Sequence, residues 1–253
     1  MSARILEVLQ AVRRGEIAPE AAIELLVNGD QTDLGFAVID DHRPVRTGIP
    51  EVVFGQGKTP EQLAGIFEHL HARHHPALAT RMDPDKAAQV KALLPDVSYE
   101  PVPRLLWRAA PGTTPFETTS KRPLWVVSAG TSDQPVAEEA ARCAEWFGLQ
   151  VHRAFDVGVA GLHRVLARAE DLRTAHAIIV VAGMEGALPS VVAGLVRIPV
   201  IAVPTSVGYG THLGGLVPLL AMLNSCASGV TVVNVDNGFG AALVAWRILE
   251  GVR

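Results

Sequence analysis

The sequence predicts an α/β protein in which a three-layer, doubly wound parallel sheet at the C-terminal end is preceded by a smaller α/β domain. From Leu124 onward, short apolar β-branched runs alternate with helix-sized segments, which is typical of a parallel sheet covered on both faces. Before that point the helical faces are longer and more charged, and a turn-rich stretch at 111–123 separates the two parts. Hydrophobic residues make up 49% of the 253 residues, which is ample for a large core.

We therefore predict a helical segment plus a small α/β domain at 1–110, a linker at 111–123, and a nucleotide-binding α/β domain at 124–253. A formal net charge of −4 argues against a broad basic surface for nucleic acid. Two cysteines cannot form a disulfide framework, and the N-terminal residues lack the apolar core of a signal peptide, so we expect a cytoplasmic protein. Residues 213–235 carry no charge, but Gly, Pro and Asn interrupt them, which favours a short helix and a buried strand over a membrane span.

The elements of the N-terminal part are read from periodicity and capping signals. Helical spacing of apolar residues covers 3–27, with a break near 15–19. Thr59 followed by Pro60 is typical of a helix start, and so is Asp83 followed by Pro84. The predicted helices are 59–73 and 83–94, and the predicted strands are 36–39, 52–54, 77–82 and 99–107.

The C-terminal part alternates regularly between strands and helices. Ligands of open parallel sheets bind at the carboxyl ends of the strands, so the loops that follow the strands are expected to carry the functional site. The predicted strands are 124–128, 150–155, 177–181, 200–203 and 230–235, and the predicted helices are 134–147, 162–169, 188–196 and one after each of the last two strands.

The loop after the first of these strands, 128–135, is rich in Ser, Thr and Gly. Such residues expose backbone N–H groups at the start of a helix, which suits a phosphate. Asp133 has two interpretations, as part of this anion site or as the N-cap of the next helix. The loop is neither a G-x-G-x-x-G fingerprint nor a Walker motif.

Two further loops bring candidate acid–base groups. Glu185 stands between an apolar strand and an apolar helix. If it is buried, burial would raise its pKa into a range useful for proton transfer. If it is exposed, it is an ordinary acid near the N-terminus of the next helix, where the helix dipole favours a negative charge. The Gly-rich loop 204–215 can close over a ligand, and its His212 is either an acid or base or a structural hydrogen-bonding residue.

The remaining candidates are a thiol and three cations. Cys226 is flanked by small polar residues and is either a reactive thiol or an inert one, whereas Cys143 lies on an apolar helix face and is predicted to pack. Arg43, Arg46 and Lys58 flank glycine turns and either bind phosphates or form surface ion pairs. Four histidines between 69 and 75 suggest a metal cluster, but their spacing favours an exposed helix end.

With these residues assembled, the chain resembles the nickel-pincer cofactor biosynthesis family, the pyridinium-3,5-biscarboxylic acid mononucleotide synthases. Its C-terminal half is also similar, more distantly, to aminoimidazole ribonucleotide carboxylases and mutases. The chain departs from the family pattern at 211–213, so the resemblance gives His212 no role. The stretches that carry the resemblance are 40–59 (D-x-x-R-x-x-R-x-G-x-P-E-V-V-F-G-x-G-K-T), 130–139 (G-T-S-D-x-P-V-A-E-E), 181–190 (V-A-G-M-E-G-A-L-P-S), 204–210 (P-T-S-V-G-Y-G) and 223–240.

The resemblance implies an aminoimidazole ribonucleotide carboxylase-like fold and an enzyme that carboxylates the pyridinium ring of nicotinic acid adenine dinucleotide with carbon dioxide. It also implies hydrolysis of the phosphoanhydride with release of AMP, assistance by Mg²⁺, and a homo-octamer. Cys226 and Glu185 are the expected catalytic residues; no metal ligands are assigned. The expected substrate-binding residues are Ser128, Gly130, Thr131, Ser132, Asp133, Gly183, Met184, Thr205, Ser206, Gly208, Tyr209, Arg43, Arg46 and Lys58.

The chemistry of the ring explains why a thiol and an acid belong together. A cationic pyridinium is electron-poor and cannot attack carbon dioxide. Addition of the Cys226 thiolate opposite the ring nitrogen would give a neutral dihydropyridine with a nucleophilic enamine carbon, and Glu185 would remove the proton after carboxylation. Two alternatives stay open: a purine-biosynthetic carboxylase or mutase, which uses a His near its Gly-rich third-strand loop, and a non-catalytic nucleotide-binding protein. In this chain that loop carries Glu185 and no His, which weighs against the first alternative.

Overall fold

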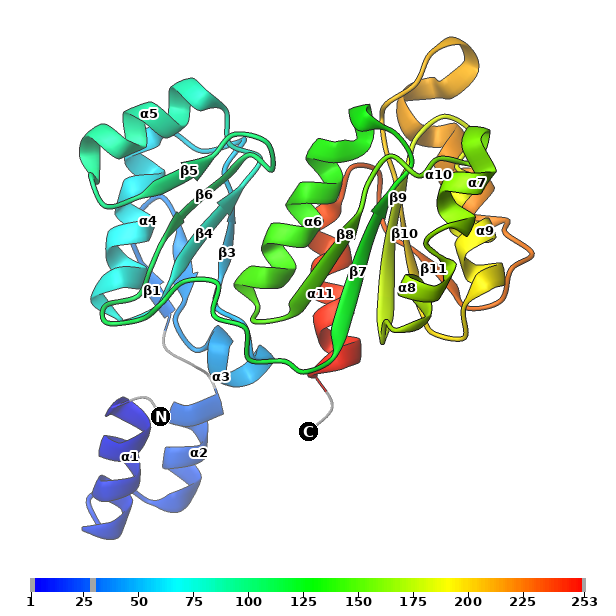
Figure 1. Cartoon of the computed structure of the whole chain (residues 1–253). Helices are drawn as coiled ribbons and strands as arrows, with labels where there is room; N and C mark the ends of the chain where they lie inside the picture. The colour runs from blue at the N-terminus through cyan, green and yellow to red at the C-terminus, as the bar shows by residue number, and fades with distance from the viewer. Residues whose placement is uncertain (1–2, 28–30, 252–253) are drawn as a thin grey trace.

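The computed structural model describes residues 3–27 and 31–251, and its two largest β-sheets lie side by side with helices around them (Figure 1). The C-terminal sheet has the order β11-β10-β9-β7-β8, and every pairing in it is parallel. The predicted parallel sheet is therefore confirmed. Its strands are β7 (Pro123–Ser128), β8 (Gln150–Ala154), β9 (Ala177–Ala182), β10 (Val200–Pro204) and β11 (Val230–Val232).

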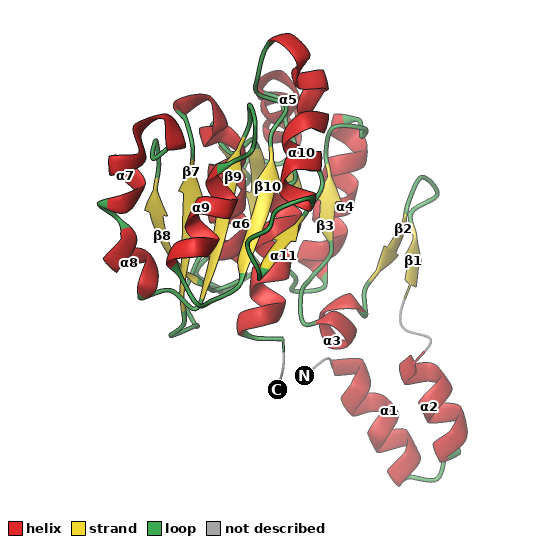
Figure 2. Cartoon of the chain, turned by 90° about the vertical axis from the view of Figure 1, so that its right-hand side faces the viewer, coloured by secondary structure: helices red, strands yellow, loops and turns green. Residues whose placement is uncertain are grey.

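Helices cover both faces of the C-terminal sheet, which confirms the three-layer arrangement (Figures 1 and 2). One face carries α6 (Gln134–Trp146) and α11 (Gly238–Leu249). The opposite face carries α7 (Leu162–Leu166), α8 (Ala169–Arg173), α9 (Leu188–Leu195) and α10 (Leu216–Leu223). When the five strands β7 to β11 are numbered 1 to 5 along the chain, their order across the sheet is 5-4-3-1-2. The winding direction therefore reverses between β7 and β9. Ligands of doubly wound sheets bind at this switch point.

The N-terminal sheet is smaller and mixed, with the order β3-β4-β6-β5 and a parallel pairing only between β3 and β4. Its strands are β3 (Val52–Phe54), β4 (Ala77–Thr80), β5 (Ser98–Glu100) and β6 (Leu105–Arg108), and its helices are α4 (Pro60–Ala72) and α5 (Pro84–Leu93). The predicted start of α4 is confirmed, because Thr59 and Gln62 exchange reciprocal side chain to backbone hydrogen bonds. The predicted start of α5 is confirmed as well, because the Asp83 carboxylate accepts a hydrogen bond from the Lys86 amide.

The first described residues form a helical hairpin of α1 (Ala3–Arg13) and α2 (Pro19–Val27), which confirms the predicted break (Figure 1). It is followed by the antiparallel pair β1 (Gln31–Asp33) and β2 (Val38–Asp40) and by the short helix α3 (Arg43–Thr47), which the sequence reasoning missed. Buried Asp41 holds this region to α4, because its carboxylate lies 2.6 Å from His69 Nε2 and accepts a 2.7 Å hydrogen bond from the Thr32 hydroxyl.

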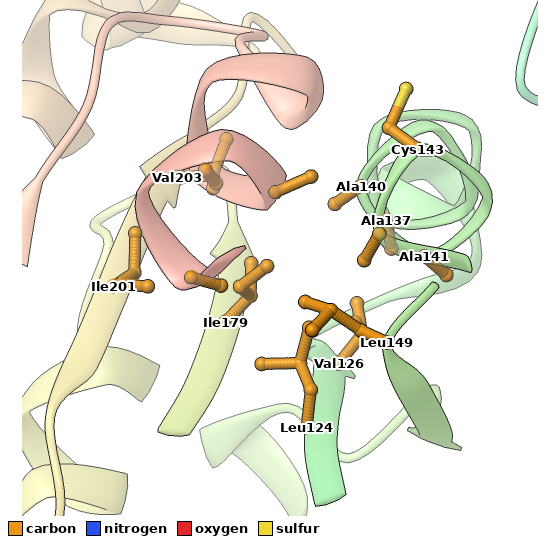
Figure 3. Close-up of a cluster of buried hydrophobic side chains, with 14 of the residues drawn as sticks. Leu124, Val126, Ala137, Ala140, Ala141, Cys143, Leu149, Ile179, Ile201 and Val203 are labelled. Atoms are coloured by element: carbon orange, nitrogen blue, oxygen red, sulfur yellow. The ribbon is translucent and has the colours of Figure 1, made fainter. Parts of the chain in front are cut away.

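Helix α6 lies between the two sheets and is the centre of the largest hydrophobic cluster (Figure 3). The cluster joins Leu78 and Leu105 of the N-terminal sheet to Leu124 and Ile179 of the C-terminal sheet. The fully buried α6 residues of this cluster are small: Ala137, Ala140, Ala141, Cys143 and Ala144. Small side chains let α11 approach closely and bury the apolar strands behind it. The Cys143 thiol is fully buried, which raises its pKa and confirms its packing role.

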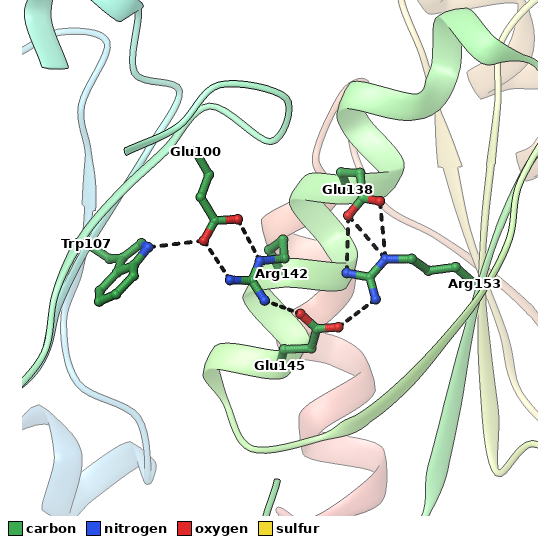
Figure 4. A network of polar contacts seen from close by, with 6 residues as sticks. All are labelled: Glu100, Trp107, Glu138, Arg142, Glu145 and Arg153. Carbon is green, nitrogen blue, oxygen red and sulfur yellow. Dashed lines mark hydrogen bonds and ion pairs between the residues drawn. The ribbon is translucent and has the colours of Figure 1, made fainter. Parts of the chain in front are cut away.

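A network of ion pairs also joins the two sheets across α6 (Figure 4). Glu100 of β5 accepts hydrogen bonds from Arg142 of α6 at 2.6 and 2.7 Å and from the Trp107 indole at 3.1 Å. On the other side, Glu145 accepts hydrogen bonds from Arg142 and from Arg153 of β8. Burial alone would raise the pKa of Glu145, but these two guanidiniums outweigh it and lower that pKa.

Two sequence predictions need correction or resolution. The single strand predicted at 99–107 is wrong, because Pro101 and Pro103 interrupt it and the chain turns back as the antiparallel pair β5 and β6. The uncharged stretch 213–235 is divided among a short 3-10 segment, α10, a loop and β11, as predicted. Among the described residues, no helix has the length and hydropathy needed to cross a membrane.

Candidate functional site

A cavity of about 560 Å³ opens at the carboxyl edge of the C-terminal sheet, beside the switch point between β7 and β9. Four segments far apart in the sequence meet there: the loops after β7, β8, β9 and β10. This is the edge at which the sequence predicted a site. Of the predicted residues, the lining includes Gly130, Thr131, Ser132, Asp133, Gly183, Met184, Glu185, Gly208 and Tyr209.

Asp133 organises the floor of this cavity. Its carboxylate accepts hydrogen bonds from the Thr205 hydroxyl at 2.7 Å and from the Gly130 amide at 2.9 Å, and it also bonds to the Gly183 backbone. One buried side chain thus connects the loops after β7, β9 and β10. Burial raises the pKa of Asp133, although each of these hydrogen bonds opposes the shift. The simple N-cap interpretation is incomplete, because Asp133 makes no side-chain cap bond to α6.

The loops after β9 and β10 touch at a point that only glycine can occupy. A Cβ built on Gly183 would lie 2.2 Å from the Val207 carbonyl oxygen and 2.6 Å from Thr205 Oγ1. The next residue, Met184, has a positive φ of 51° and donates its amide to the Val207 carbonyl at 3.1 Å. This close approach aligns the two loops along one wall of the cavity.

Glu185 lies in the cavity lining, and its side chain is exposed. Of its two sequence interpretations, the exposed acid before a helix is the one that the structure favours. Tyr209 is also strongly exposed, at 81% of its full accessible surface. Both side chains stand at the rim, where a ligand or another protein chain can reach them.

Two of the predicted binding residues stabilise the site from behind. Ser128 is fully buried, and its hydroxyl accepts a 3.3 Å hydrogen bond from the Asp156 amide, which joins the loops after β7 and β8. Thr205 is fully buried and is committed to Asp133. Ser206, which is exposed, donates its amide to Asp236 and lines a neighbouring cavity instead. None of these three lines the main cavity.

Cys226 is exposed and lies outside the cavity. It belongs to the loop 224–229, between α10 and β11, and the Ser225 hydroxyl beside it lies 2.7 Å from the Ser190 hydroxyl on α9. Because β11 begins level with Val200, the first residue of β10, this loop leads to the amino edge of the sheet. Within one chain the structure therefore does not bring the thiol and Glu185 into one site.

The three predicted cations are not brought together either. Arg43 and Arg46 lie on α3, before β3, whereas Lys58 follows the carboxyl end of β3. Arg46 forms an ion pair with Asp40 at 2.5 Å, which matches the surface ion-pair interpretation. The short strand between them keeps the two groups at opposite edges of the N-terminal sheet.

His212 is buried, and its Nδ1 accepts a 3.2 Å hydrogen bond from the Gly215 amide. Its ring packs directly against Gly208, where a Cβ would lie 2.3 Å from the imidazole. These contacts favour the structural interpretation of His212. In the described part of the chain, no three His, Cys, Asp or Glu side chains are grouped so that they could hold a metal ion.

Sequence reasoning missed the two charged residues that the loop after β8 and the start of α7 bring to the cavity, Asp156 and Arg164, which form an ion pair at 3.0 Å. Asp156 follows β8, so the rule that pointed to the other loops would also have found it. It also missed Glu139 on α6, whose pKa burial raises to about 7. Glu139 accepts hydrogen bonds from the amides of Gly238 and Phe239, and these partners come from α11, about a hundred residues later.

Comparison with known families decides the relationship of the chain. Residues 31–110 match the LarB/PurE-like N-terminal domain, and residues 124–252 match AIR carboxylase. The chain belongs to the LarB-like family. The resemblance predicted from the sequence is thereby confirmed, and the two matches indicate an enzyme of the AIR carboxylase/LarB type.

Relatives of this LarB-like chain fall into two groups. Protein MJ0165 of Methanocaldococcus jannaschii is 37% identical, over 99% of this chain and 98% of its own length. The N5-carboxyaminoimidazole ribonucleotide mutase of Pyrococcus horikoshii is 36% identical over 51% of this chain and 74% of the mutase. A crystal structure of a Treponema denticola PurE2 variant aligns with 52% of this chain and 82% of its own, at 26% identity and a TM-score of 0.43.

Proposed function

We propose that this LarB-like chain carboxylates the pyridinium ring of nicotinic acid adenine dinucleotide with carbon dioxide and hydrolyses the phosphoanhydride, giving pyridinium-3,5-biscarboxylic acid mononucleotide and AMP. The observation that carries the proposal is the cavity at the switch point, which unites the small-residue loop 130–133 with Glu185. The exposed amides and hydroxyls of that loop suit the phosphate and ribose of a nucleotide. The acid at the rim suits proton removal from the ring.

The chemistry divides one difficult carboxylation into two manageable steps. The Cys226 thiolate adds to the ring carbon opposite the nitrogen, and the ring π-electrons move to the nitrogen to give a neutral dihydropyridine. Its enamine carbon attacks carbon dioxide and forms a carbon–carbon bond. Glu185 then removes the proton from that carbon, and the ring regains its aromaticity as the carbon–sulfur bond breaks and the thiolate leaves.

This mechanism requires the thiol and the acid to come from different copies of the chain, because Cys226 lies outside the cavity of its own chain. We propose that a second copy, within the expected octamer, covers the apolar face that leads to Cys226. That face is the exposed side of α10, where three leucines recur at helical spacing: Leu216, Leu220 and Leu223. Burying such a stripe would stabilise the association, and a symmetric assembly repeats the contact in every subunit.

Mg²⁺ is part of the proposal through the substrate phosphates. Mg²⁺ is commonly held by one or two carboxylates together with phosphate oxygens, and it keeps several waters. Asp156 is an exposed carboxylate of the cavity lining and would take one of these positions in exchange for its ion pair with Arg164. When bound, the ion would neutralise charge on the phosphoanhydride. The residues around it would orient the dinucleotide.

A mutase of purine biosynthesis is the alternative that the relatives raise, since the mutase of Pyrococcus horikoshii aligns with half of this chain. The resemblance places a His in the loop after the third strand of such enzymes, where this chain has Glu185. The full-length match to a protein with both parts of the chain also favours the LarB-like reaction.

Two parallel incubations and a binding measurement separate the possibilities. The full chain is mixed either with nicotinic acid adenine dinucleotide, labelled bicarbonate and Mg²⁺ or with N5-carboxyaminoimidazole ribonucleotide, the products are identified by mass spectrometry, and nucleotide binding is measured by calorimetry. We expect a labelled dicarboxylated mononucleotide and AMP. Conversion of N5-carboxyaminoimidazole ribonucleotide alone would establish the mutase, and nucleotide binding without turnover would establish the non-catalytic protein. Cys226→Ala should abolish carboxylation, whereas Glu185→Gln should stop the reaction after ring addition; full turnover by either variant would remove that residue from the mechanism.

A further inference from the structure

A second cavity, of about 210 Å³, lies where the N-terminal sheet meets the carboxyl edge of the C-terminal sheet. We call it the junction cavity. It shares Ser132 and Val207 with the main cavity, so the two spaces adjoin. Its lining comes from both parts of the chain: Arg81, Pro103 and Arg104 from the N-terminal part, and Ser132, Pro135, Val136, Glu139, Ser206, Val207 and Asp236 from the C-terminal part.

Two arginines give this cavity its positive charge. Arg81 follows the carboxyl end of β4, and Arg104 lies in the turn between β5 and β6. Within the residues that the structure describes, neither guanidinium forms an ion pair with a carboxylate. Arg81 donates to the Asp236 carbonyl, and Arg104 donates through Nε to the Met82 carbonyl at 2.9 Å. A guanidinium has five N–H donors, so most of them stay available for a ligand.

The backbone holds both arginines in an uncommon conformation. Arg81 and Arg104 have positive φ angles of 57° and 55°, and the Met82 amide between the two loops donates to the Arg104 carbonyl at 2.9 Å. Left-handed backbone costs free energy at a residue with a long side chain, so the surrounding structure must impose it. The two loops are therefore fixed relative to each other, and their side chains line one space.

The acidic residues of the cavity offset only part of this charge. Asp236 supplies one carboxylate, which accepts a hydrogen bond from the Ser206 amide at 2.7 Å, against the two guanidiniums. Burial raises the pKa of Glu139 to about 7, against the opposing effect of nearby Arg81, so this carboxyl is partly protonated at neutral pH. Ser132 and Ser206 are exposed and supply hydroxyl groups beside the two arginines. Positive charge and hydroxyl donors together suit a phosphate, which guanidinium groups bind in a bidentate manner.

We propose that the junction cavity is the binding site for the nucleoside monophosphate half of a dinucleotide, with Arg81 and Arg104 as its phosphate ligands. This inference rests on the proposed function, because the pyridinium half would occupy the main cavity. The phosphoanhydride would then cross Ser132 and Val207, the two residues that both cavities share. The N-terminal part of the chain would thus supply half of the substrate site.

Calorimetric titration of the full chain tests the assignment with three probes: AMP, nicotinic acid mononucleotide and inorganic pyrophosphate. In Arg81→Gln and in Arg104→Gln we expect the Kd for AMP to rise at least about tenfold, which corresponds to the loss of one charge-assisted contact. The Kd for nicotinic acid mononucleotide should change by less than about threefold. Lys91→Gln removes the same charge from an exposed position on α5 outside the cavity and is the matched control.

Three results would overturn the proposal: unchanged AMP binding in both variants, an equal loss in the Lys91→Gln control, or an equal loss for the two mononucleotides. Arg81→Lys and Arg104→Lys retain the charge without the planar fork and should show an intermediate loss, which keeps the test valid where a Gln variant fails to fold. Failure of the carboxylation reaction with arginine-dependent AMP binding intact would remove the proposed function and leave the phosphate site standing. Pyrophosphate binding that follows the same arginines would show that phosphate, rather than adenosine, is the group recognised.

Discussion

The Thr205 hydroxyl donates a 2.7 Å hydrogen bond to the Asp133 carboxylate, and both side chains are buried at the carboxyl edge of the parallel sheet. The two residues lie 72 positions apart in the sequence. Through this contact the small-residue loop after β7 is fixed to the Gly-rich loop after β10. The same carboxylate bonds to the Gly183 backbone, so three of the four cavity loops share one anchor.

Thr205→Val keeps the shape of the side chain and removes the donor. Because the Asp133 carboxylate is buried and loses a partner, we expect the free energy of unfolding to fall by about 1–3 kcal/mol. The pKa of Asp133 should rise further, since this hydrogen bond lowers it. Urea denaturation measures the loss. Thr231→Val, on the exposed side of β11, is the control and should change stability by less than about 0.5 kcal/mol; equal effects at both positions would contradict the anchor.

Gly183→Ala should disrupt the cavity wall. The added Cβ would meet the Val207 carbonyl at 2.2 Å and Thr205 Oγ1 at 2.6 Å, so one loop must move away from the other. We expect a loss of about 1–3 kcal/mol in stability and a large loss of nucleotide affinity, measured by thermal unfolding with and without ligand. Gly194→Ala on α9 meets nothing within 4 Å and should be neutral or stabilising.

Glu139 makes stability fall as the pH rises. Its pKa is raised from 4.5 to about 7 in the folded chain, so between these values the folded state binds a proton that the unfolded state has released. Stability from this group is therefore full below about pH 4.5 and decreases through pH 7, by up to about 3 kcal/mol. Glu139→Gln keeps an acceptor for the Gly238 amide and removes the titration. Urea unfolding between pH 5 and pH 8 should show that the free energy of unfolding of the variant rises relative to that of the wild type as the pH increases. An unchanged difference between the two proteins across this range would contradict the assignment.

Mixed assemblies test whether Cys226 and Glu185 act across a subunit boundary. Cys226→Ala and Glu185→Gln should each be inactive alone, but their co-expression should restore about a quarter of the wild-type carboxylation rate, since random assembly pairs intact groups in that share of sites. If both groups act within one chain, no mixture regains activity. A mixture of Cys226→Ala with Cys226→Ser should stay inactive and serves as the control for assembly itself.

Much of this fold and site follows from local sequence. Apolar β-branched runs and capping pairs such as Thr59 and Gln62 determine where strands and helices form, because these signals act within a few residues. The rule that ligands bind at the carboxyl ends of parallel strands then pointed to the loops of Asp133 and Glu185, which the structure does bring into one cavity. The family relationship was also visible in the sequence motifs alone.

Only the tertiary structure decided which of these groups meet. In the sequence, Glu139 is one of several charged residues in a predicted helix, and nothing local marks it as buried. Packing against the start of α11 buries it and raises its pKa. Arg81 and Arg104 are separate surface arginines in the sequence, and two fixed loops bring them to one cavity. Cys226, the most suggestive residue of the sequence, lies outside the cavity of its own chain. The physical reason is that burial, and the distance between two side chains, depend on how strands and helices pack, and no local pattern encodes that packing.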